Sequence, residues 1–296
     1  IEGDTQIVLY EENATPYNKQ KEVALTTDIL SKSKPLIDFR HKDQTTIEFD
    51  REPLNPYAST NLGKTLVTAD INNDGYDDIL TLGAKGQTSS IYVYNNGAYQ
   101  EITLPEAQQD AIAEDTDAAI FDADGNGSLD IVIVSGGNEF RQGPALRPRL
   151  YLQKDKSFVK QENAFKSLSL NASSVTAVDI DNDSHIDLNF TANVVPHRFA
   201  QSATQYLYKN SGQATFTDVT STYAPSFKNL GNVQAVIWAD LDQNGYKDAV
   251  FAGHWMPLQI YFNDGQHLAK QSSNGLSKSN GLWNTITAAD IDLDGD

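Results

Sequence analysis

Five short acidic segments carry the residues of this chain that are best suited to chemistry. Their first aspartates are Asp70, Asp122, Asp179, Asp240 and Asp290, and oxygen-bearing side chains recur at every second position after each. Side chains at positions 1, 3, 5 and 9, with a backbone carbonyl at position 7, surround a hard cation such as Ca²⁺ in known protein loops. The spacing therefore predicts a cation-binding loop in each segment.

The candidate metal ligands occupy the same register in every loop. Position 7 contributes its backbone carbonyl and the other positions contribute their side chains. The fifth loop is cut before its position 9. The full set is Asp70, Asn72, Asp74, Tyr76, Asp78, Asp122, Asp124, Asn126, Ser128, Asp130, Asp179, Asp181, Asp183, His185, Asp187, Asp240, Asp242, Asn244, Tyr246, Asp248, Asp290, Asp292 and Asp294.

Position 6 of these loops is suited to a sharp turn. It is glycine in four of the five loops, and glycine adopts a left-handed conformation without a steric penalty. In the third loop it is Ser184, where the same conformation would cost about 1–2 kcal/mol. The loops are not EF-hands, because position 12 carries no glutamate and lies within an apolar stretch.

Ligands that offer only oxygen favour Ca²⁺ over Zn²⁺ or Cu²⁺. Up to five bound Ca²⁺ would bring the formal charge of the chain from −18 to −8, an ordinary value for a protein surface. The alternative is that the acidic turns are merely solvated, and the third loop is the one most open to it. We expect the metal to be structural, since each loop uses its oxygens to close itself.

The acidic loops recur with a period that indicates their structural setting. Their first aspartates are spaced by 52, 57, 61 and 50 residues, which suits one four-stranded propeller blade per repeat. Short apolar stretches rich in β-branched residues flank each loop, and a second strand pair with an Asn-Gly, Ser-Gly or Asp-Gly turn follows in most repeats. The sequence predicts an all-β protein, a β-propeller of four-stranded blades.

The repeats also set the expected domain organisation. We expect residues 1–34 to be the end of a preceding module with a linker, and residues 35–296 to be the β-propeller. Four blades and the start of a fifth are present, and we expect seven in the full protein, so the propeller is truncated at its C-terminus.

Composition excludes several classes of protein. The chain contains no cysteine, which rules out disulfide scaffolds and cysteine-based metal or catalytic sites. With 40 acidic against 22 basic residues it is not expected to bind nucleic acid. No apolar run is long enough to span a bilayer. The motifs of serine hydrolases, zinc proteases and nucleotide-binding folds are missing.

The alternation of strand, DxDxDG-type loop and strand resembles the FG-GAP/VCBS repeats of integrin-α-like β-propellers. A closer similarity is to bacterial FG-GAP-like proteins of the Bacteroidetes with ASPIC/UnbV modules, relatives of cartilage acidic protein. It rests on the segments 37–59, 135–142, 147–152, 253–265 and 281–296. The resemblance implies a secreted or outer-membrane-exposed protein, possible lipid anchoring through a missing segment, and calcium-stabilised blades that bind a partner.

Two insertions and three tryptophans stand apart from the repeat. The insertions 138–149 and 194–204 carry basic residues, which either contact an anionic partner or acidic glycan, or form local salt bridges to the acidic turns. Trp238, Trp255 and Trp283 could stack on sugar rings, but packing between blades is the commoner use and the one that we expect. We expect His254 to be packed or capping.

Taken together, these features predict a calcium-stabilised binding module at a cell surface, with a protein or glycan partner and no catalytic residues. The family resemblance makes an accessory role in a SusC/SusD-type outer-membrane complex a plausible setting. The alternative from another class is a calcium-dependent polysaccharide lyase or hydrolase on a propeller scaffold. Arg, His, Tyr or carboxylate side chains that converge on one face would distinguish it.

Overall fold

The computed structural model describes residues 34–45, 48–58, 60, 63, 66–272 and 275–290. The chain divides into two compact units, Ile1–Leu36 and Ile37–Asp296, and all the elements described below belong to the second. The interpretation of residues 1–34 as the end of another module falls almost entirely outside the described residues and stays a prediction.

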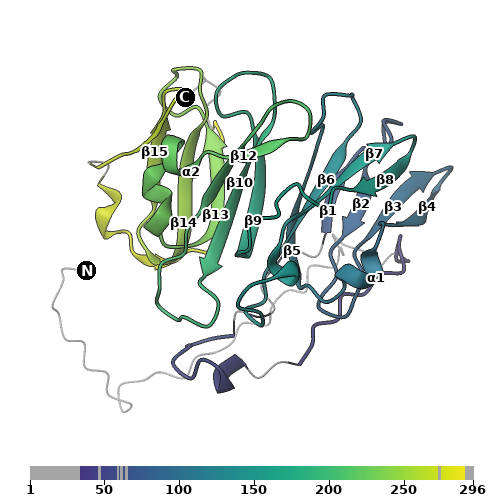
Figure 1. Cartoon of the computed structure of the whole chain (residues 1–296), viewed down its shortest axis with the longest axis horizontal. Helices are drawn as coiled ribbons and strands as arrows, with labels where there is room; N and C mark the ends of the chain where they lie inside the picture. Colours follow the sequence, from purple (N-terminus) through teal and green to yellow (C-terminus); the bar gives the residue numbers. More distant parts are fainter. Residues whose placement is uncertain are drawn as a thin grey trace, which may run out of the picture. The chain divides into compact units, whose positions relative to one another are not determined.

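Four antiparallel sheets follow one another along the chain, and each is built from four consecutive strands (Figure 1). The first contains β1 (Leu66–Ala69), β2 (Asp78–Thr81), β3 (Ser90–Asn95) and β4 (Ala98–Thr103), and the second contains β5 (Asp115–Phe121), β6 (Asp130–Ser135), β7 (Arg149–Lys154) and β8 (Ser157–Lys160). The third contains β9 (Asn171–Val178), β10 (Asp187–Val194), β11 (Tyr206–Asn210) and β12 (Phe216–Asp218). The fourth contains β13 (Asn232–Ala239), β14 (Asp248–Met256), β15 (Gln259–Asn263) and β16 (Leu268–Lys270).

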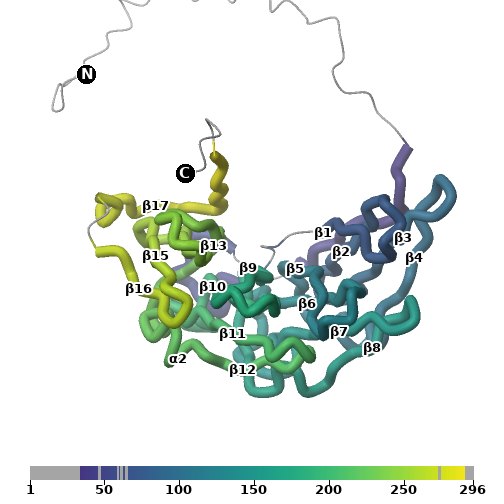
Figure 2. The backbone as a smooth tube through the Cα atoms, turned by 90° about the horizontal axis from the view of Figure 1, so that it is seen from above, coloured from purple at the N-terminus to yellow at the C-terminus, as the bar shows by residue number. Residues whose placement is uncertain are grey.

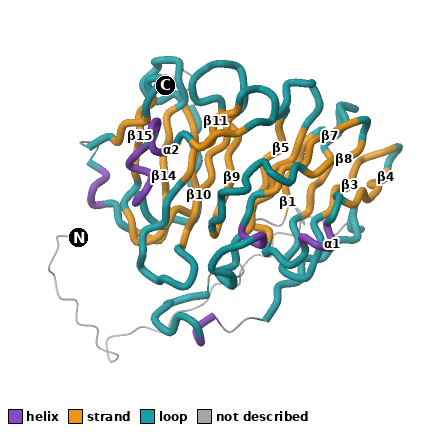
Figure 3. Tube along the Cα trace, in the orientation of Figure 1, coloured by secondary structure: helices purple, strands orange, loops and turns teal. Residues whose placement is uncertain are grey.

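The helices of the described residues are short and lie outside the sheets (Figure 3). They are α1 (Ala107–Asp110), α2 (Thr220–Tyr223) and the 3₁₀ turns Glu48–Asp50, Pro144–Leu146, Pro225–Asn229 and Leu276–Lys278. The prediction of an all-β chain made of four-stranded blades is confirmed, as is the expected hairpin that closes each blade.

Neighbouring blades pack through their faces, and the first strand of each blade contacts the first strand of the next (Figure 2). Strand β6 shows why the sequence produces this arrangement. Its Ile131 and Ile133 belong to a core shared with the first blade, whereas Val132 and Val134 belong to a core shared with the third. Alternate side chains of a strand point to opposite faces, so a continuous run of apolar residues places the strand between two sheets.

A short extra strand, β17 (Gly281–Leu282), pairs with the end of β14 beyond the part covered by β15. After β17, residues 283–290 have no regular structure in the described part of the chain. The stretch 285–289, predicted as the strand that precedes the fifth acidic loop, forms no strand, and the rest of that loop, from residue 291 onward, lies outside the described residues.

One irregular segment connects all four blades. This crossing segment, residues 37–45 and 48–58, touches each blade close to the end of its second strand. His41 donates to the Leu82 carbonyl of the first blade at 3.1 Å, and Asn138 of the second donates to Glu48 at 2.9 Å. The third blade donates to the segment through Phe199 N–H, and the fourth meets it at His254, which accepts from Tyr57.

Candidate functional site

Each of the first four acidic loops joins the first strand of a blade to the second, so all four lie at the same end of their sheets. Position 9 is the first residue of the second strand and is fully buried in every blade, as Asp78, Asp130, Asp187 and Asp248. The loops therefore share one geometry, imposed by the hairpin that they close.

The position 1 carboxylate forms the centre of each loop. Asp240 shows the pattern: one oxygen accepts from Asn244 N–H at 3.1 Å and the other from Gly245 N–H at 2.9 Å. Asp70 and Asp122 accept from the same positions of their own loops. The backbone thus wraps around position 1, with a left-handed residue at position 6 in all four loops.

Ser184 adopts the left-handed conformation that position 6 demands, with φ of +68°. The structure thus confirms the expected left-handed conformation at a residue other than glycine. Position 4 is also left-handed in all four loops, at Asn73, Gly125, Asn182 and Gln243. This second turn was not predicted from the sequence, although Asn and Gly at three of the four positions were a usable signal.

The position 9 aspartate ties its loop to the rest of the blade. In the fourth blade, one Asp248 oxygen accepts from Leu241 N–H at 2.8 Å and the other from Asn263 N–H, at the end of β15, at 2.8 Å. The equivalent pair of bonds occurs at position 9 of the other three blades. This carboxylate is thus a structural link as well as a candidate ligand, which the sequence pattern alone did not reveal.

Positions 1, 3 and 9 converge in the second, third and fourth loops, where one carboxylate oxygen from each lies within 4.8 Å of the others. The first loop has Asn72 at position 3 and offers an amide oxygen there in place of a carboxylate. In the fifth loop, Asp292 and Asp294 lie outside the described residues, so only Asp290 is placed.

The third loop gives a direct test of whether a cation fits. Asp179 Oδ1 and Asp181 Oδ1 are buried and accept no hydrogen bond within the described part of the chain. A buried carboxylate oxygen without a partner is costly, and a coordinated cation removes that cost. The donor set of this loop, four carboxylates and the backbone carbonyl of His185, suits Ca²⁺.

Burial has a strong effect on the position 9 carboxyls. It raises the pKa of Asp187 to about 7 and that of Asp130 to about 6, against the lowering effect of their backbone hydrogen bonds. Neighbouring loop carboxylates raise the pKa of both groups further. A bound cation would act in the opposite sense and hold these groups ionised.

The third loop also has a cationic neighbour of its own. Lys209, on β11, forms an ion pair with Asp181 and lies 3.2 Å from Asp183, so its ammonium group meets positions 3 and 5 of the loop. The side-chain bonds to Asp181 and Asp183 raise the pKa of this lysine, although burial opposes the shift. An ammonium group therefore supplies part of the charge balance that a metal ion would supply.

A further group of metal-capable side chains, His41, Asp43 and Glu114, lies outside the loops. Both ring nitrogens of His41 already have partners, the Leu82 carbonyl at 3.1 Å and Asp43 at 3.0 Å. We therefore assign no metal to this group. Burial raises the pKa of Glu114 to about 7, and its carboxylate accepts from Lys85 N–H at 2.8 Å.

A second polar cluster has the residue types of a catalytic site but no room for a substrate. Buried Arg149 forms an ion pair with Asp115, and Tyr151 donates to Asp110 at 2.8 Å. The cavity beside these residues measures only about 10 Å³. A single water needs at least ~10–15 Å³ of such space, so the cluster is an internal brace between strands and not a site of turnover.

The basic insertions form no salt bridge to the acidic loops within the described residues. Arg149 pairs with Asp115, which begins β5 and lies outside the loops, whereas Arg141 and Arg198 are exposed and pair with no carboxylate in this part of the chain. Arg141 donates instead to His197 at 3.0 Å, which joins the two insertions.

The expectation that all three tryptophans pack between blades is wrong. Trp238 does pack against the core between the third and fourth blades, but Trp255 is 54% exposed and Trp283 is 39% exposed. Their positions at the end of β14 and after β17 leave them outside the blade interfaces. His254 is buried and hydrogen-bonded, as expected.

Similarity to solved structures is confined to general fold. A lectin from Agrocybe aegerita that recognises non-reducing terminal N-acetylglucosamine is 20% identical over 70% of this chain and 50% of its own, with a TM-score of 0.43. The V. cholerae biofilm matrix protein Bap1 is 18% identical over 72% and 31%, with a TM-score of 0.35. The matched region spans half or less of the length of these two proteins.

No curated protein matches the sequence. None of the helices in the described residues is long and apolar enough to cross a membrane. The FG-GAP-like repeat matches residues 70–133, 122–188 and 240–296, which include all five acidic loops and cover more than half of the sequence. Together with the four antiparallel blades, this match shows that the chain belongs to the FG-GAP-like repeat family.

Proposed function

We propose that this chain is a calcium-stabilised binding module of an extracellular or cell-surface protein. The observation that carries the proposal is the convergence of positions 1, 3 and 9 at the same end of three blades. The buried Oδ1 atoms of Asp179 and Asp181, which accept no hydrogen bond from any residue that the structure describes, support it. Millimolar calcium outside cells suits loops of this kind.

The metal has a structural role in this proposal. Position 9 links the loop to the third strand of its blade, so a cation held there stabilises the contact of three strands at once. Removing the cation leaves several carboxylates close together in a partly buried setting, which opposes folding. Binding that occurs only in the folded state stabilises it by mass action.

The proposed setting extends the family assignment. We propose that the module belongs to a Bacteroidetes protein with an ASPIC/UnbV module, exposed at the outer membrane and accessory to a SusC/SusD-type complex. Two exposed arginines without carboxylate partners among the described residues, Arg141 and Arg198, support a protein or glycan partner that is anionic. Purification of the native protein with no membrane partner would argue against this setting.

Calcium binding is tested by thermal unfolding in chelator and in about 1–5 mM Ca²⁺, with Mg²⁺ as the control ion. We expect a rise in Tm that is specific to Ca²⁺. Two variants of the fourth loop separate ligation from structure. Asp242→Asn should weaken the calcium response without lowering stability in chelator, because Asp242 is exposed and its charge only adds to the repulsion within the metal-free loop.

Asp248→Asn should destabilise the protein in both conditions. Each oxygen of its carboxylate accepts one backbone N–H group. The side chain of asparagine has a single oxygen, and its NH₂ group cannot accept the second bond. A Tm that is the same in chelator and Ca²⁺ would refute the proposal. If both variants had the same Tm in chelator, Asp248 would have no structural role beyond that of Asp242.

A further inference from the structure

A pocket walled by apolar and polar side chains lies at the opposite end of the fourth blade from its acidic loop. Strand β14 begins at Asp248, in a loop, and ends at Met256, in the pocket. Its nine residues place the two sites about 26–27 Å apart. A ligand in this pocket therefore makes no contact with a cation in the fourth loop.

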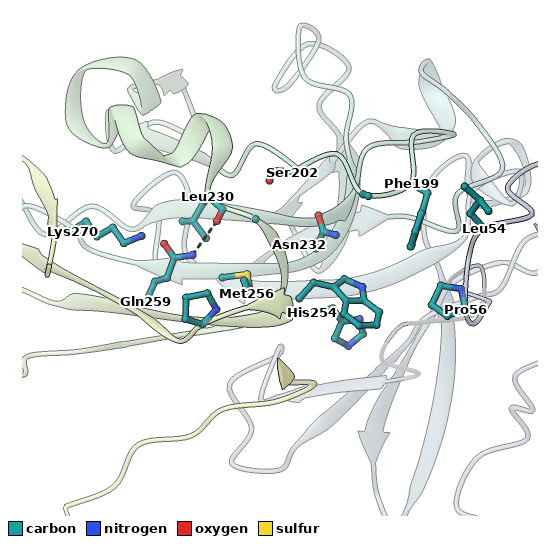
Figure 4. A pocket seen from close by; sticks show the side chains of 14 residues that line it. Leu54, Pro56, Phe199, Ser202, Leu230, Asn232, His254, Met256, Gln259 and Lys270 are labelled. Atoms are coloured by element: carbon teal, nitrogen blue, oxygen red, sulfur yellow. Dashed lines mark hydrogen bonds between the residues drawn. The ribbon is translucent and has the colours of Figure 1, made fainter. Parts of the chain in front are cut away.

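The pocket measures about 510 Å³, within the range of small-molecule sites. Three parts of the unit line it (Figure 4): the crossing segment through Leu54 and Pro56, the third blade through Phe199, and the fourth blade through β13 to β16. Both apolar and polar side chains face it, and the bond from Gln259 to the Leu230 carbonyl, at 3.0 Å, fixes part of the wall.

Trp255 is held in this pocket by an unusual backbone. Its φ is +62°, a conformation that bulky residues rarely adopt, and the pairing of β14 with β17 shifts register between His254 and Met256. Bulges of this kind redirect a side chain, and strained residues persist where the surroundings hold them. The result is a large indole, 54% exposed, on the wall of a pocket.

The neighbours of Trp255 hold this conformation in place. His254 is buried, accepts from Tyr57 and meets Asn284 Oδ1 through its other ring nitrogen at 2.7 Å. On the other side of the strand, a Cβ on Gly253 would clash with the Asn232 carbonyl oxygen, so only glycine allows this close approach. The bulge is therefore anchored by contacts from the crossing segment, from the segment after β17 and from β13.

The charge of the pocket differs from that of the chain. The formal charge of the chain is −18, yet no carboxylate lines the pocket, and its one fully cationic side chain, Lys270, has no ion-pair partner among the described residues. Exposed Arg198, without a carboxylate partner in the same set, directly precedes Phe199 of the pocket wall. The charge of the lining thus favours an anionic ligand over a cationic one.

Polar side chains also line the pocket. The Ser202 hydroxyl and the Gln259 amide are groups that can hydrogen-bond a ligand hydroxyl. An aromatic platform beside hydrogen-bonding groups and a cation suits a ring that has an apolar face, hydroxyl groups and a negative charge. Acidic sugars have all three.

We infer that this pocket binds an acidic oligosaccharide, with Trp255 stacking on one sugar ring and Lys270 meeting the carboxylate of another. The inference rests on the proposed role as a surface binding module, whose partner class it specifies. It does not require a Ca²⁺ ion in contact with the sugar, since the acidic loops lie at the other end of the strands.

The test is calorimetric titration of the full chain in millimolar Ca²⁺ with trigalacturonate, trimannuronate and a hyaluronan tetrasaccharide. Maltotriose is the neutral control and tri-glutamate is the acidic control that lacks a sugar ring. We expect at least one acidic oligosaccharide to bind and both controls to fail. Trp255→Ala should weaken binding about tenfold, and Trp283→Ala, which removes an exposed tryptophan outside the pocket, should leave it unchanged.

Lys270→Gln should weaken binding of the acidic oligosaccharide while the calcium-dependent Tm stays that of the parent. No binding by any acidic oligosaccharide, equal binding of tri-glutamate, or unchanged binding by Trp255→Ala would each overturn the inference. The calcium response of the same samples separates the two proposals. A Tm that rises in Ca²⁺ without sugar binding refutes only the pocket, whereas a Tm indifferent to Ca²⁺ refutes the proposed calcium role.

Discussion

Among single residues, the acidic loops combine two kinds of carboxylate. Those at position 1 organise the loop backbone, and those at position 9 are fully buried and connect the loop to the third strand of the blade. Position 6 adopts a left-handed conformation at the sharp turn. Among the four described loops, only the third has a residue other than glycine there, Ser184.

Ser184→Gly should stabilise the protein, since glycine removes the strain of a φ of +68° at this position. The expected gain is about 1 kcal/mol, or a rise in Tm of about 2–4 °C in a domain of this size. Differential scanning calorimetry provides the measurement. The mirror variant Gly245→Ser, at φ of +91°, should lower Tm, and a rise there would contradict this explanation.

Glu114 gives a prediction about pH. Burial raises its pKa in the folded protein to about 7, from an ordinary value of 4.5, so the folded state binds the proton more tightly than the unfolded state. Stability from this group is therefore complete below pH ~4.5 and is lost as pH rises toward ~7.

Glu114→Gln should remove this dependence, and the variant should gain stability relative to the parent as pH rises from ~4.5 to ~7. Urea unfolding of both proteins in saturating Ca²⁺, which keeps the loop carboxylates ionised, isolates the contribution. A difference in the free energy of unfolding that does not change with pH would show that Glu114 titrates normally.

Among the structural elements, each blade is a pair of hairpins in which the acidic loop closes the first. The third blade differs because β11 brings Lys209 to positions 3 and 5 of its loop. This ion pair balances part of the loop charge without a metal, so the third loop should respond to calcium less than its neighbours do.

Lys209→Gln should increase the calcium response. In chelator the variant loses the ion pair and becomes less stable, by up to about 1 kcal/mol because the lysine is partly exposed. In Ca²⁺ the cation takes over the charge balance, so the Tm difference between the two conditions should widen by about 2–4 °C. Lys247→Gln, in the fourth loop, is the matched control, and an equal widening there would contradict the argument.

Across the whole unit of residues 37–296, two kinds of contact hold the blades together. Apolar cores fill the spaces between adjacent sheets, and the crossing segment adds polar contacts to all four blades. Its contact with the second blade is deeply buried. There Asn138 donates to both Glu48 and Glu52, and all three side chains are buried.

Asn138→Ala should destabilise the protein by about 1–3 kcal/mol, because it leaves two buried carboxylates without their shared donor. Chemical unfolding in Ca²⁺ measures the loss. Gln108→Ala, at an exposed position of α1, serves as the control and should change stability by less than about 0.5 kcal/mol. Equal effects of the two substitutions would show that the crossing segment does not brace the second blade.

The blades and the acidic loops follow from the order of the residues alone. Short apolar stretches rich in β-branched residues, Gly-containing turns and the register of Asp70 to Asp78 and its repeats are local signals. Local spacing fixes which oxygens can converge within nine residues. The hairpins, the left-handed Ser184 and the convergence of Asp240, Asp242 and Asp248 are therefore predictable from the sequence.

Other features arise only when the chain folds, because they join residues far apart in it. Lys209 meets Asp181 across 28 positions, and Tyr57 meets His254 across 197, and no spacing rule connects such pairs. The sequence predicts a buried Trp255, because no local pattern of residues indicates the bulge that turns its side chain outward. The loops are thus local in origin, whereas the pocket exists only where the crossing segment and two blades meet.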